Sequence, residues 1–287
     1  MIMDNSYRFN NRSKSQTKQI QHHYELIQHI FIEMEHVLVA FSGGVDSALL
    51  LKVGTDALGA KCTGVLGVSP SLAGDEKNQA IQFAQKLNAN LEILFTREME
   101  NPLYLQNDHR RCFYCKQELY SEIWRLAEEK NIHFVVDGTN ADDVTDYRPG
   151  LDAAKALKVR SPLLEAGLGK DDIRNLAQYL NIPVWDKPAQ PCLASRVMYG
   201  QPIEAAVLEK IYYAEQFIKK RGYKIVRVRS IGSYASVEVG KDEVDRLLQE
   251  EESHIIIKTL YDLGFQKVHI DPDGYRQGKL NARTATG

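Results

Sequence analysis

Between residues 19 and 200, short apolar runs alternate with stretches in which apolar residues recur at helical spacing. The short runs predict β-strands at 37–41, 63–68, 91–95, 133–137 and 183–185. The helical spacing predicts α-helices at 19–35, 75–87, 116–130 and 170–180. Because strands that alternate with helices usually form a mainly parallel sheet between helical layers, we expect an α/β fold.

The pattern changes beyond about residue 200. It predicts a helix at 203–221, strands at 223–229 and 234–239, helical stretches within 241–263 and a strand at 265–270. This order is typical of a small α+β unit. The first 18 residues are polar and lack periodic apolar positions, so we expect a loose tail there. The predicted parts are therefore a tail at 1–18, a larger domain at 19–200 and a smaller one at 201–287.

Composition narrows the class of protein. The 287 residues carry a formal net charge of −2, which gives no overall attraction to nucleic acid or to an acidic membrane. We see no apolar run long enough to span a membrane and no signal peptide, so we expect a cytoplasmic protein. The 4 cysteines are too few to suggest a disulfide framework in a chain of this length.

A glycine turn follows the strand at 37–41 and opens a helix. Its residues are Ser42, Gly43, Gly44, Val45, Asp46 and Ser47. Glycines let an anion approach the backbone closely, and N–H groups at a helix start converge on that anion. The serine hydroxyls add donors, and Asp46 is a candidate to orient the loop or to hold Mg²⁺. The lysine that ends a Walker A loop is absent.

This turn favours a phosphate site in an enzyme that splits ATP into AMP and pyrophosphate. The alternative is an ordinary strand-to-helix turn. The string resembles the PP-loop of the N-type ATP pyrophosphatases, whose domain is Rossmann-like and is related to the adenine nucleotide alpha hydrolases.

A second polar segment follows the strand at 133–137 and is expected at the same edge of the sheet. It contains Gly138, Asp142 and Asp143. The two carboxylates are candidates to hold Mg²⁺ or to orient a substrate hydroxyl. The alternative is a helix start that is capped by Asp or Asn.

Three cysteines lie in segments that read as turns. Cys112 and Cys115 have C-x-x-C spacing, and Cys192 lies much further along the chain. Three thiolates can hold three irons of a 4Fe-4S cluster and leave the fourth iron open to an exogenous ligand such as sulfide. Neighbouring arginines and Lys116 would favour the thiolate form. The alternative is a pair of packed cysteines at a helix start, and we expect Cys62 to be a core residue.

Arg227 and Arg229 alternate along one predicted strand and so share a face, with Glu238 on the next strand. Two arginines that point the same way can bind a phosphate or a carboxylate. Solvated side chains on an exposed strand are the alternative.

Together, several motifs resemble the LarE family over about residues 20 to 281. They lie at 42–47, 111–116, 138–143, 147–150, 160–163, 191–196, 227–229 and 274–281. LarE proteins supply sulfur for the nickel-pincer nucleotide cofactor of lactate racemase and related enzymes. The resemblance implies that ATP adenylylates a carboxylate of pyridinium-3,5-biscarboxylic acid mononucleotide, and that sulfur then displaces AMP to leave a thiocarboxylate.

The same resemblance implies roles for individual residues. Substrate binding falls to Arg196, Arg227 and Arg229, and catalysis to Asp46 and the three cysteines. Nucleotide binding falls to Ala40, Ser42, Gly43, Gly44, Asp46, Ser47, Val68 and Gly138. The implied cofactors are ATP, Mg²⁺ and a 4Fe-4S cluster, and the implied partners are proteins of the nickel-pincer cofactor pathway and further copies of the chain in a homo-oligomer.

LarE proteins differ in their sulfur source. Some have one cysteine, at the position of Cys192, and sacrifice it in a single turnover that leaves dehydroalanine. Others have three cysteines and resemble cluster enzymes. Because Cys112 and Cys115 depart from the single-cysteine pattern, we expect the cluster route here and keep sacrifice of Cys192 as the alternative.

Other functions stay open at this point. A tRNA thiolase joins a PP-loop to three similar cysteines, but it should carry a basic surface or an RNA-binding module. A non-catalytic regulator that senses ATP would bind the nucleotide without turnover. An amidotransferase-type ligase is disfavoured because no glutaminase segment is present.

Overall fold

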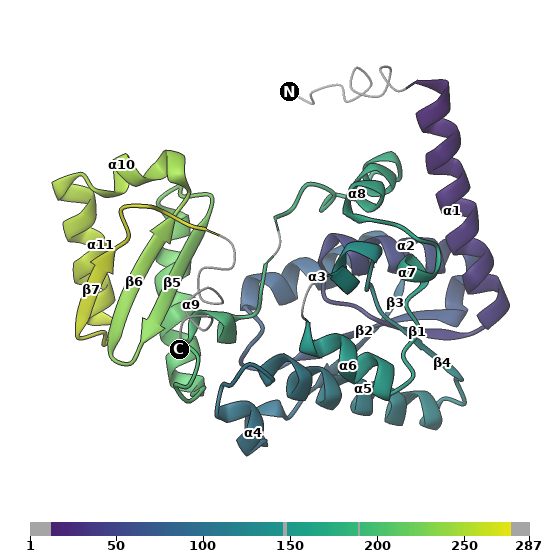
Figure 1. Ribbon diagram of the computed structural model, residues 1–287, viewed down its shortest axis with the longest axis horizontal. Coiled ribbons are helices and arrows are strands. Elements are labelled where there is room, and N and C mark those ends of the chain that lie inside the picture. The colour runs from purple at the N-terminus through teal and green to yellow at the C-terminus, as the bar shows by residue number, and fades with distance from the viewer. Residues whose placement is uncertain (1–12, 146–147, 189, 277–287) are drawn as a thin grey trace. The chain divides into compact units, whose positions relative to one another are not determined.

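The computed structural model describes residues 13–145, 148–188 and 190–276. The chain divides into two compact units. The first unit contains Met1–Gly67, Asp75–Thr96 and Lys116–Gln190, and the second contains Val68–Gly74, Arg97–Cys115 and Pro191–Gly287. Each unit has its own sheet, and Figure 1 labels the elements of both.

The first unit is built on a four-stranded sheet. Its strands follow the order β3-β2-β1-β4, and β1 runs parallel to both β2 and β4. The bounds are β1 Val37–Ala40, β2 Cys62–Val68, β3 Asn90–Phe95 and β4 Phe134–Val136. Every residue of β1 is buried, as expected for the central position of a strand between helices. The predicted α/β class is confirmed.

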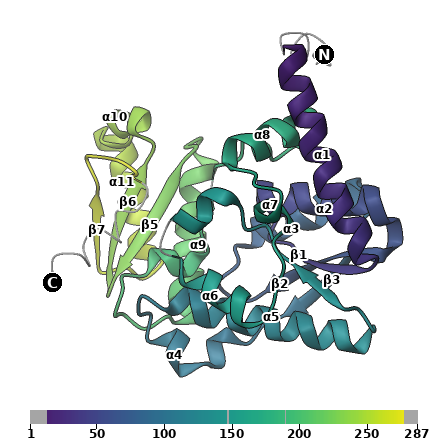
Figure 2. The ribbon, with the colours of Figure 1, turned by 45° about the vertical axis from the view of Figure 1, so that its right-hand side comes forward.

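Helices cover both faces of this sheet, with α2 on one side and α5 on the other (Figures 1 and 2). A Cβ on Gly64 of β2 would meet Leu51 of α2 at 3.2 Å, whereas one on Gly67 would meet Leu119 of α5 at 2.6 Å. Residues three apart on a strand face opposite sides, so the two glycines let the two helices approach closely. The helices are α1 Lys14–Met34, α2 Val45–Leu58, α3 Gly74–Lys86, α5 Arg111–Glu129, α6 Pro149–Ala156, α7 Pro162–Glu165 and α8 Lys170–Tyr179.

The second unit packs helices on a three-stranded sheet of order β5-β6-β7. Strands β5 and β6 form an antiparallel hairpin, and β7 runs parallel to β6. Side chains of α9, β5 and β6 fill its core, and Tyr104 of the short helix α4 joins them together with Leu193 and Val197. The elements are α4 Pro102–Leu105, α9 Ala205–Lys220, β5 Val226–Ile231, β6 Tyr234–Val239, α10 Val244–Leu247, α11 Glu250–Asp262 and β7 Lys267–Ile270. This is the predicted α+β arrangement.

Short 3₁₀ turns complete the two units, at η2 Gly59–Lys61, η3 Glu98–Glu100, η4 Ala141–Thr145, η5 Leu193–Arg196 and η6 Lys241–Glu243. Among the described residues, no helix is both long enough and apolar enough to cross a membrane.

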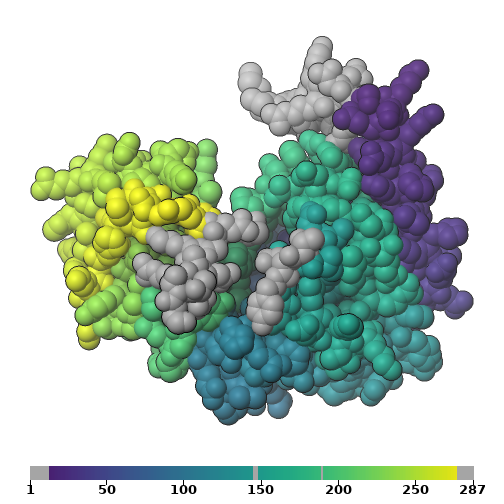
Figure 3. Space-filling model, in the orientation of Figure 1, coloured from purple at the N-terminus to yellow at the C-terminus, as the bar shows by residue number. Residues whose placement is uncertain are grey.

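Two expected boundaries differ from the structure. The first helix, α1, begins at Lys14 and not at residue 19, because Ser13 and Gln16 form a capping box that starts it earlier. This helix, purple in Figure 3, lies at the surface, and most of its side chains are exposed or half-buried. The second unit also reaches back before residue 200, since Tyr104 and Leu193 belong to its core. Residues 1–12 of the predicted tail lie outside the described residues.

The strand predicted at 183–185 is absent from the described part of this segment, which forms turns instead. The backbone N–H of Trp185 donates to the carbonyl of Ile182 at 3.1 Å, and that of Lys187 donates to Val184 at 3.1 Å. These local bonds use the donors that a sheet ladder would need, and Pro183 has no N–H to offer.

Candidate functional site

The glycine turn leads from β1 into α2 with a backbone that only glycine adopts easily. Gly43 has a φ of +75°, and a Cβ there would lie 3.0 Å from the Cβ of Ala80. Gly44 is the N-cap of α2, so the free N–H groups of the first helical turn start immediately after it. The predicted strand, turn and helix start are all confirmed at this position.

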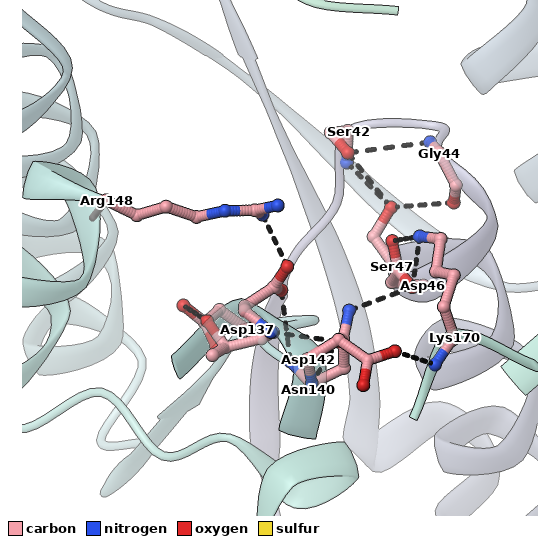
Figure 4. Close-up of polar contacts among 11 residues, drawn as sticks. Ser42, Gly44, Asp46, Ser47, Asp137, Asn140, Asp142, Arg148 and Lys170 are labelled. Carbon is pink, nitrogen blue, oxygen red and sulfur yellow. Dashed lines mark hydrogen bonds and ion pairs between the residues drawn. The ribbon is translucent and has the colours of Figure 1, made fainter. Parts of the chain in front are cut away.

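Two serine side chains brace the turn from within (Figure 4). The Ser47 hydroxyl accepts a hydrogen bond from the N–H of Ser42 at 3.2 Å and donates to the carbonyl of Gly44 at 3.1 Å. The two serine Oγ atoms are 3.1 Å apart. Ser42 is exposed whereas Ser47 is buried, so the turn presents one hydroxyl to solvent and uses the other to hold its shape.

Asp46 lies in the first turn of α2 and forms an ion pair with Lys170, the first residue of α8. The lysine Nζ is 2.5 Å and 2.7 Å from the two carboxylate oxygens (Figure 4). Sequence reasoning missed Lys170, because a lysine at the start of a predicted helix is ordinarily solvated. The structure therefore supplies a cation beside the loop that lacks the Walker A lysine.

The segment after β4 reaches the same turn, because β4 and β1 are parallel neighbours and their ends are adjacent. A Cβ on Gly138 would lie 3.0 Å from the backbone nitrogen of Ser47, so only glycine fits there without a shift. The Asn140 amide donates to Asp46 at 3.4 Å. The two polar segments predicted at one edge of the sheet thus come together.

Asp137 anchors that segment. Its buried carboxylate accepts hydrogen bonds from the hydroxyls of Tyr120 and Ser161, each at 2.7 Å, and from the hydroxyl and the N–H of Thr139 at 3.0 and 3.1 Å. A buried carboxylate with this many donors is well compensated, so Asp137 holds the segment in place.

The two aspartates proposed for Mg²⁺ have protein partners here. Asp142 accepts a hydrogen bond from the N–H of Lys170 at 2.7 Å, and Asp143 forms an ion pair with Arg148. Burial raises the pKa of Asp143, and the charge of Arg148 opposes that rise. Within residues 13–145, 148–188 and 190–276, no group of three or more His, Cys, Asp or Glu side chains is arranged to hold a metal ion. The Mg²⁺ role of these carboxylates stays a prediction.

The three candidate cysteines all lie in the second unit. Cys112 and Cys115 occupy the first turn of α5, and Cys192 is the N-cap of η5. The turn expected around the C-x-x-C pair is wrong, because Asp108 accepts the N–H groups of Arg110 and Arg111 and so starts the helix before the cysteines.

The accessibility of the cysteines separates them into two kinds. Cys112 and Cys192 are exposed and Cys115 is half-buried, and all three are free thiols. Cys62 is fully buried in β2, where burial raises the pKa of its thiol to about 12. The prediction that Cys62 is a core residue is confirmed.

A buried arginine stands between the exposed cysteines electrostatically. Arg111 is 6% exposed. Burial lowers its pKa, but negative charge on Cys192 and then on Cys112 outweighs that effect and raises it above the usual value. Cys192 and Cys115 likewise add to the burial that raises the pKa of Tyr104. Each of these two side chains therefore feels Cys192 together with one cysteine of α5.

The three arginines proposed for substrate binding are buried, not solvated. Arg196 donates to both carboxylate oxygens of Glu215, at 2.9 and 3.1 Å, and Arg229 donates to Glu238 at 3.1 and 3.2 Å. Arg227 lies 5.1 Å from the ring centre of Tyr275, and burial and the charge of Arg196 lower its pKa. Buried cations held by carboxylates form a pre-organised cluster, and substrate binding by it stays a prediction.

Comparison with known proteins places the chain in a family, although no family model matches it. Over 87% of its length the chain is 32% identical to pyridinium-3,5-bisthiocarboxylic acid mononucleotide synthase of Lactiplantibacillus plantarum, and the match covers 90% of that protein. The chain belongs to the LarE family. The resemblance seen in the sequence motifs is thereby confirmed.

Other relatives agree with the LarE assignment. Uncharacterized proteins of Synechocystis and Methanocaldococcus jannaschii are 40% and 32% identical over 90% and 84% of the chain, and the matches cover 96% and 90% of those proteins. One chain of the glutamine-hydrolyzing GMP synthase from Methanococcus maripaludis is 28% identical over 53% of the chain and 52% of its own length. This more distant match supports the PP-loop type of the α/β domain.

Some LarE motif residues cannot be located. Tyr147, and the part of the C-terminal motif at 277–281, lie outside the described residues. Val68 ends β2 and belongs to the second unit, and Ala40 ends β1 directly before the glycine turn.

The different burial of the thiols predicts their reactivity. With iodoacetamide at neutral pH, Cys112 and Cys192 should be alkylated at least about 100-fold faster than Cys62, since alkylation needs an accessible thiolate. Peptide mass spectrometry after a time course would measure the three rates. Equal labelling of Cys62 in the folded protein would contradict the burial, and labelling in urea gives the reference for full access.

Proposed function

We propose that the chain is an ATP-dependent sulfurtransferase that converts a carboxylate of pyridinium-3,5-biscarboxylic acid mononucleotide into a thiocarboxylate. The observation that carries this proposal is the glycine turn at the N-terminus of α2 in a chain that belongs to the LarE family. The name of the Lactiplantibacillus plantarum relative describes a bisthiocarboxylic acid mononucleotide as the product of that protein. Support for the substrate therefore comes from kinship, and support for nucleotide binding comes from the loop.

The reaction has two steps in which atoms and charges balance. A carboxylate oxygen of the substrate attacks the α-phosphorus of ATP, and pyrophosphate leaves. A sulfur nucleophile then attacks the carbonyl carbon of the acyl adenylate, and AMP leaves with the oxygen. Adenylylation replaces a poor leaving group with a good one, so the second step is easier than direct exchange of oxygen for sulfur.

The residues of the first unit serve the first step. The N–H groups at the start of α2 and the hydroxyl of Ser42 bind the β- and γ-phosphates, where the helix dipole adds partial positive charge. Lys170 neutralises charge near Asp46, and Asp46 is the best placed carboxylate to hold Mg²⁺ once nucleotide draws the lysine away. The positive charge that a Walker A lysine provides in other enzymes comes here from the start of α8.

The three cysteines of the second unit serve the second step. Three free thiols, of which two are exposed, match the donor chemistry of an iron-sulfur cluster with three protein ligands, and the nearby Arg111 favours their ionised form. Cys112, Cys115 and Cys192 would hold a 4Fe-4S cluster, which would supply the sulfur as sulfide. Arg196, Arg227 and Arg229 bind the phosphate or carboxylates of the substrate. A homo-oligomer and contacts with nickel-pincer pathway proteins complete the proposal.

A second sulfur source is favoured by the exposure of Cys192 at the start of η5. In that route the Cys192 thiolate displaces AMP and forms a thioester. Loss of its α-proton then breaks the Cβ–S bond, so the thiocarboxylate leaves and dehydroalanine remains. No oxidant or reductant is needed, and the protein acts once.

The products of ATP cleavage test the proposed function. Anaerobically prepared protein with α-labelled ATP and the dicarboxylate mononucleotide should release AMP and pyrophosphate in step with the thiocarboxylate. Release of ADP, or ATP binding with no substrate-dependent turnover, would refute the proposal and favour a regulator. Turnover with tRNA in place of the mononucleotide would indicate a thiolase instead. Peptide mass spectrometry separates the two sulfur sources, since the sacrificial route removes the mass of hydrogen sulfide from Cys192.

A lysine variant tests the residue that sequence reasoning missed. Lys170→Met should lower kcat/KM for ATP by about tenfold or more, because it removes a cation from the phosphate site. Lys52→Met is the matched control, since Lys52 forms a similar pair with Asp56 on α2. Equal and unchanged kinetics in both variants would show that Lys170 does not act on the nucleotide.

A further inference from the structure

A buried asparagine connects the two segments that carry the cysteines. Asn107 follows α4 with a left-handed φ of 55°, and it is fully buried. Its amide nitrogen donates to the carbonyls of Met198 and Gln201 at 2.8 and 2.9 Å, and to that of Val197 at 3.4 Å. One side chain thus binds three backbone carbonyls of the segment that follows Cys192.

Arg111 extends this connection to the first turn of α5. Its Nη1 donates to the Asn107 side-chain oxygen at 2.5 Å and to the carbonyl of Ala194 at 3.1 Å. Its guanidinium also lies 5.2 Å from the ring centre of Tyr199. Arg111 is the residue before Cys112, and Ala194 is two residues after Cys192. The pair therefore binds within two residues of a candidate cysteine at each end.

The backbone reinforces the same contact. The N–H of Gly200 donates to the carbonyl of Asn107 at 3.0 Å, and the N–H of Ile203 donates to that of Leu105 at 3.0 Å. All these residues belong to the second unit, so the contact is internal to one compact body.

A purely structural contact would not need a buried cation. The Nε of Arg111 has no hydrogen-bond partner among the described residues, and a buried unpaired donor is destabilising by roughly 1–3 kcal/mol. An apolar side chain would fill this position without that penalty. The charge is useful, however, beside thiolates, because a nearby cation stabilises the ionised sulfur.

We propose that Asn107 and Arg111 are positioning residues that hold the segment of Cys192 against the first turn of α5, so that Cys192, Cys112 and Cys115 act as one sulfur site. This assignment rests on the proposed function for its purpose, but its geometry can be tested without ATP or substrate. Asn107 sets the position of the segment, and Arg111 adds positive charge next to the thiols.

Cross-linking of the protein alone tests the positioning. A short bis-maleimide should join Cys192 to a cysteine of α5, and it should join Cys112 to Cys115 within one helical turn. Asn107→Gly, which tolerates the left-handed φ, should slow the cross-link to Cys192 by about tenfold, since loss of positioning lowers the effective concentration of the thiols. The cross-link within the helix should not change. Asn101→Gly is the control, because Asn101 caps α4 and its side chain accepts the N–H of Leu103.

A second variant keeps the test decisive if Asn107→Gly lowers the melting temperature. Asn107→Asp retains the shape and the acceptor for Arg111 but places a carboxylate against three carbonyls. It should slow the cross-link to Cys192 as well. Wild-type cross-linking in the folded Asn107→Asp protein would overturn the positioning role, whatever the result for Asn107→Gly.

The charge of Arg111 has a separate readout. Arg111→Met should move the midpoint of the pH profile for Cys192 alkylation upward by about one pH unit, and Arg111→Lys should restore most of the shift. Unchanged profiles in both variants would overturn the electrostatic part. If the protein fails to form AMP from ATP while these cross-linking and alkylation results hold, the proposed function is wrong and the positioning pair stands.

Discussion

Replacing Asp46 by asparagine is expected to lower the rate of AMP and pyrophosphate formation by about 10²–10³-fold, because it removes the carboxylate that the first turn of α2 places beside the phosphate loop. The substitution keeps the shape of the side chain and its contact with Asn140, which donates at 3.4 Å. It removes the negative charge that pairs with Lys170 and that would hold Mg²⁺. Release of labelled pyrophosphate under saturating substrate measures the effect.

The matched control is Asp56→Asn. Asp56 lies on the same helix, pairs with Lys52 in the same way and accepts a hydrogen bond from Tyr24 at 3.0 Å, but it is outside the glycine turn. Its replacement should leave the rate within about twofold of wild type, since surface ion pairs contribute little. If the two variants have the same rate, Asp46 has no special role in ATP cleavage.

Replacing Cys192 by alanine is expected to abolish thiocarboxylate formation while the release of pyrophosphate continues. Both sulfur routes require this thiol, one as a cluster ligand and the other as the sulfur itself. The acyl adenylate forms without sulfur, so the first step needs only the phosphate loop and the substrate site. Mass spectrometry of the mononucleotide and the pyrophosphate assay, run on one sample, measure the two steps separately.

Cys112→Ala then distinguishes the two routes. It should abolish sulfur transfer if a cluster supplies the sulfur, because a cluster with two protein ligands is not retained. It should leave one turnover per chain if Cys192 is sacrificed. Thiocarboxylate formation by Cys192→Ala at the wild-type rate would refute both routes.

Much of the fold follows from local pattern. Strands β2 and β3 and helices α3 and α8 lie within one residue of the ranges that hydrophobic periodicity predicts, because burial of one face is written directly in the spacing of apolar residues. The segment at 183–185 shows the limit of that argument. Three residues with apolar character can end in turns as readily as in a strand when a proline interrupts the ladder.

The candidate site divides in the same way. The loop at 42–47 was found because glycine and serine in that order after a strand have few other uses, and the segment at 138–143 followed from the parallel sheet. Lys170 was missed, although 124 residues of chain separate it from a carboxylate 2.5 Å away. A pair so distant in sequence leaves no periodic or spacing signal. Burial of Arg196, Arg227 and Arg229 was missed for the same reason, since the partners Glu215 and Glu238 lie on other elements.

By itself, the sequence determined the α/β class, the phosphate loop and the LarE kinship, because each depends on residues that are close together along the chain. Only the tertiary structure decided that Lys170 neutralises Asp46, that the substrate arginines are buried beside carboxylates, and that Asn107 and Arg111 link the cysteine segments. These contacts form when packing brings distant segments together, and buried polar groups take whichever partners that packing offers.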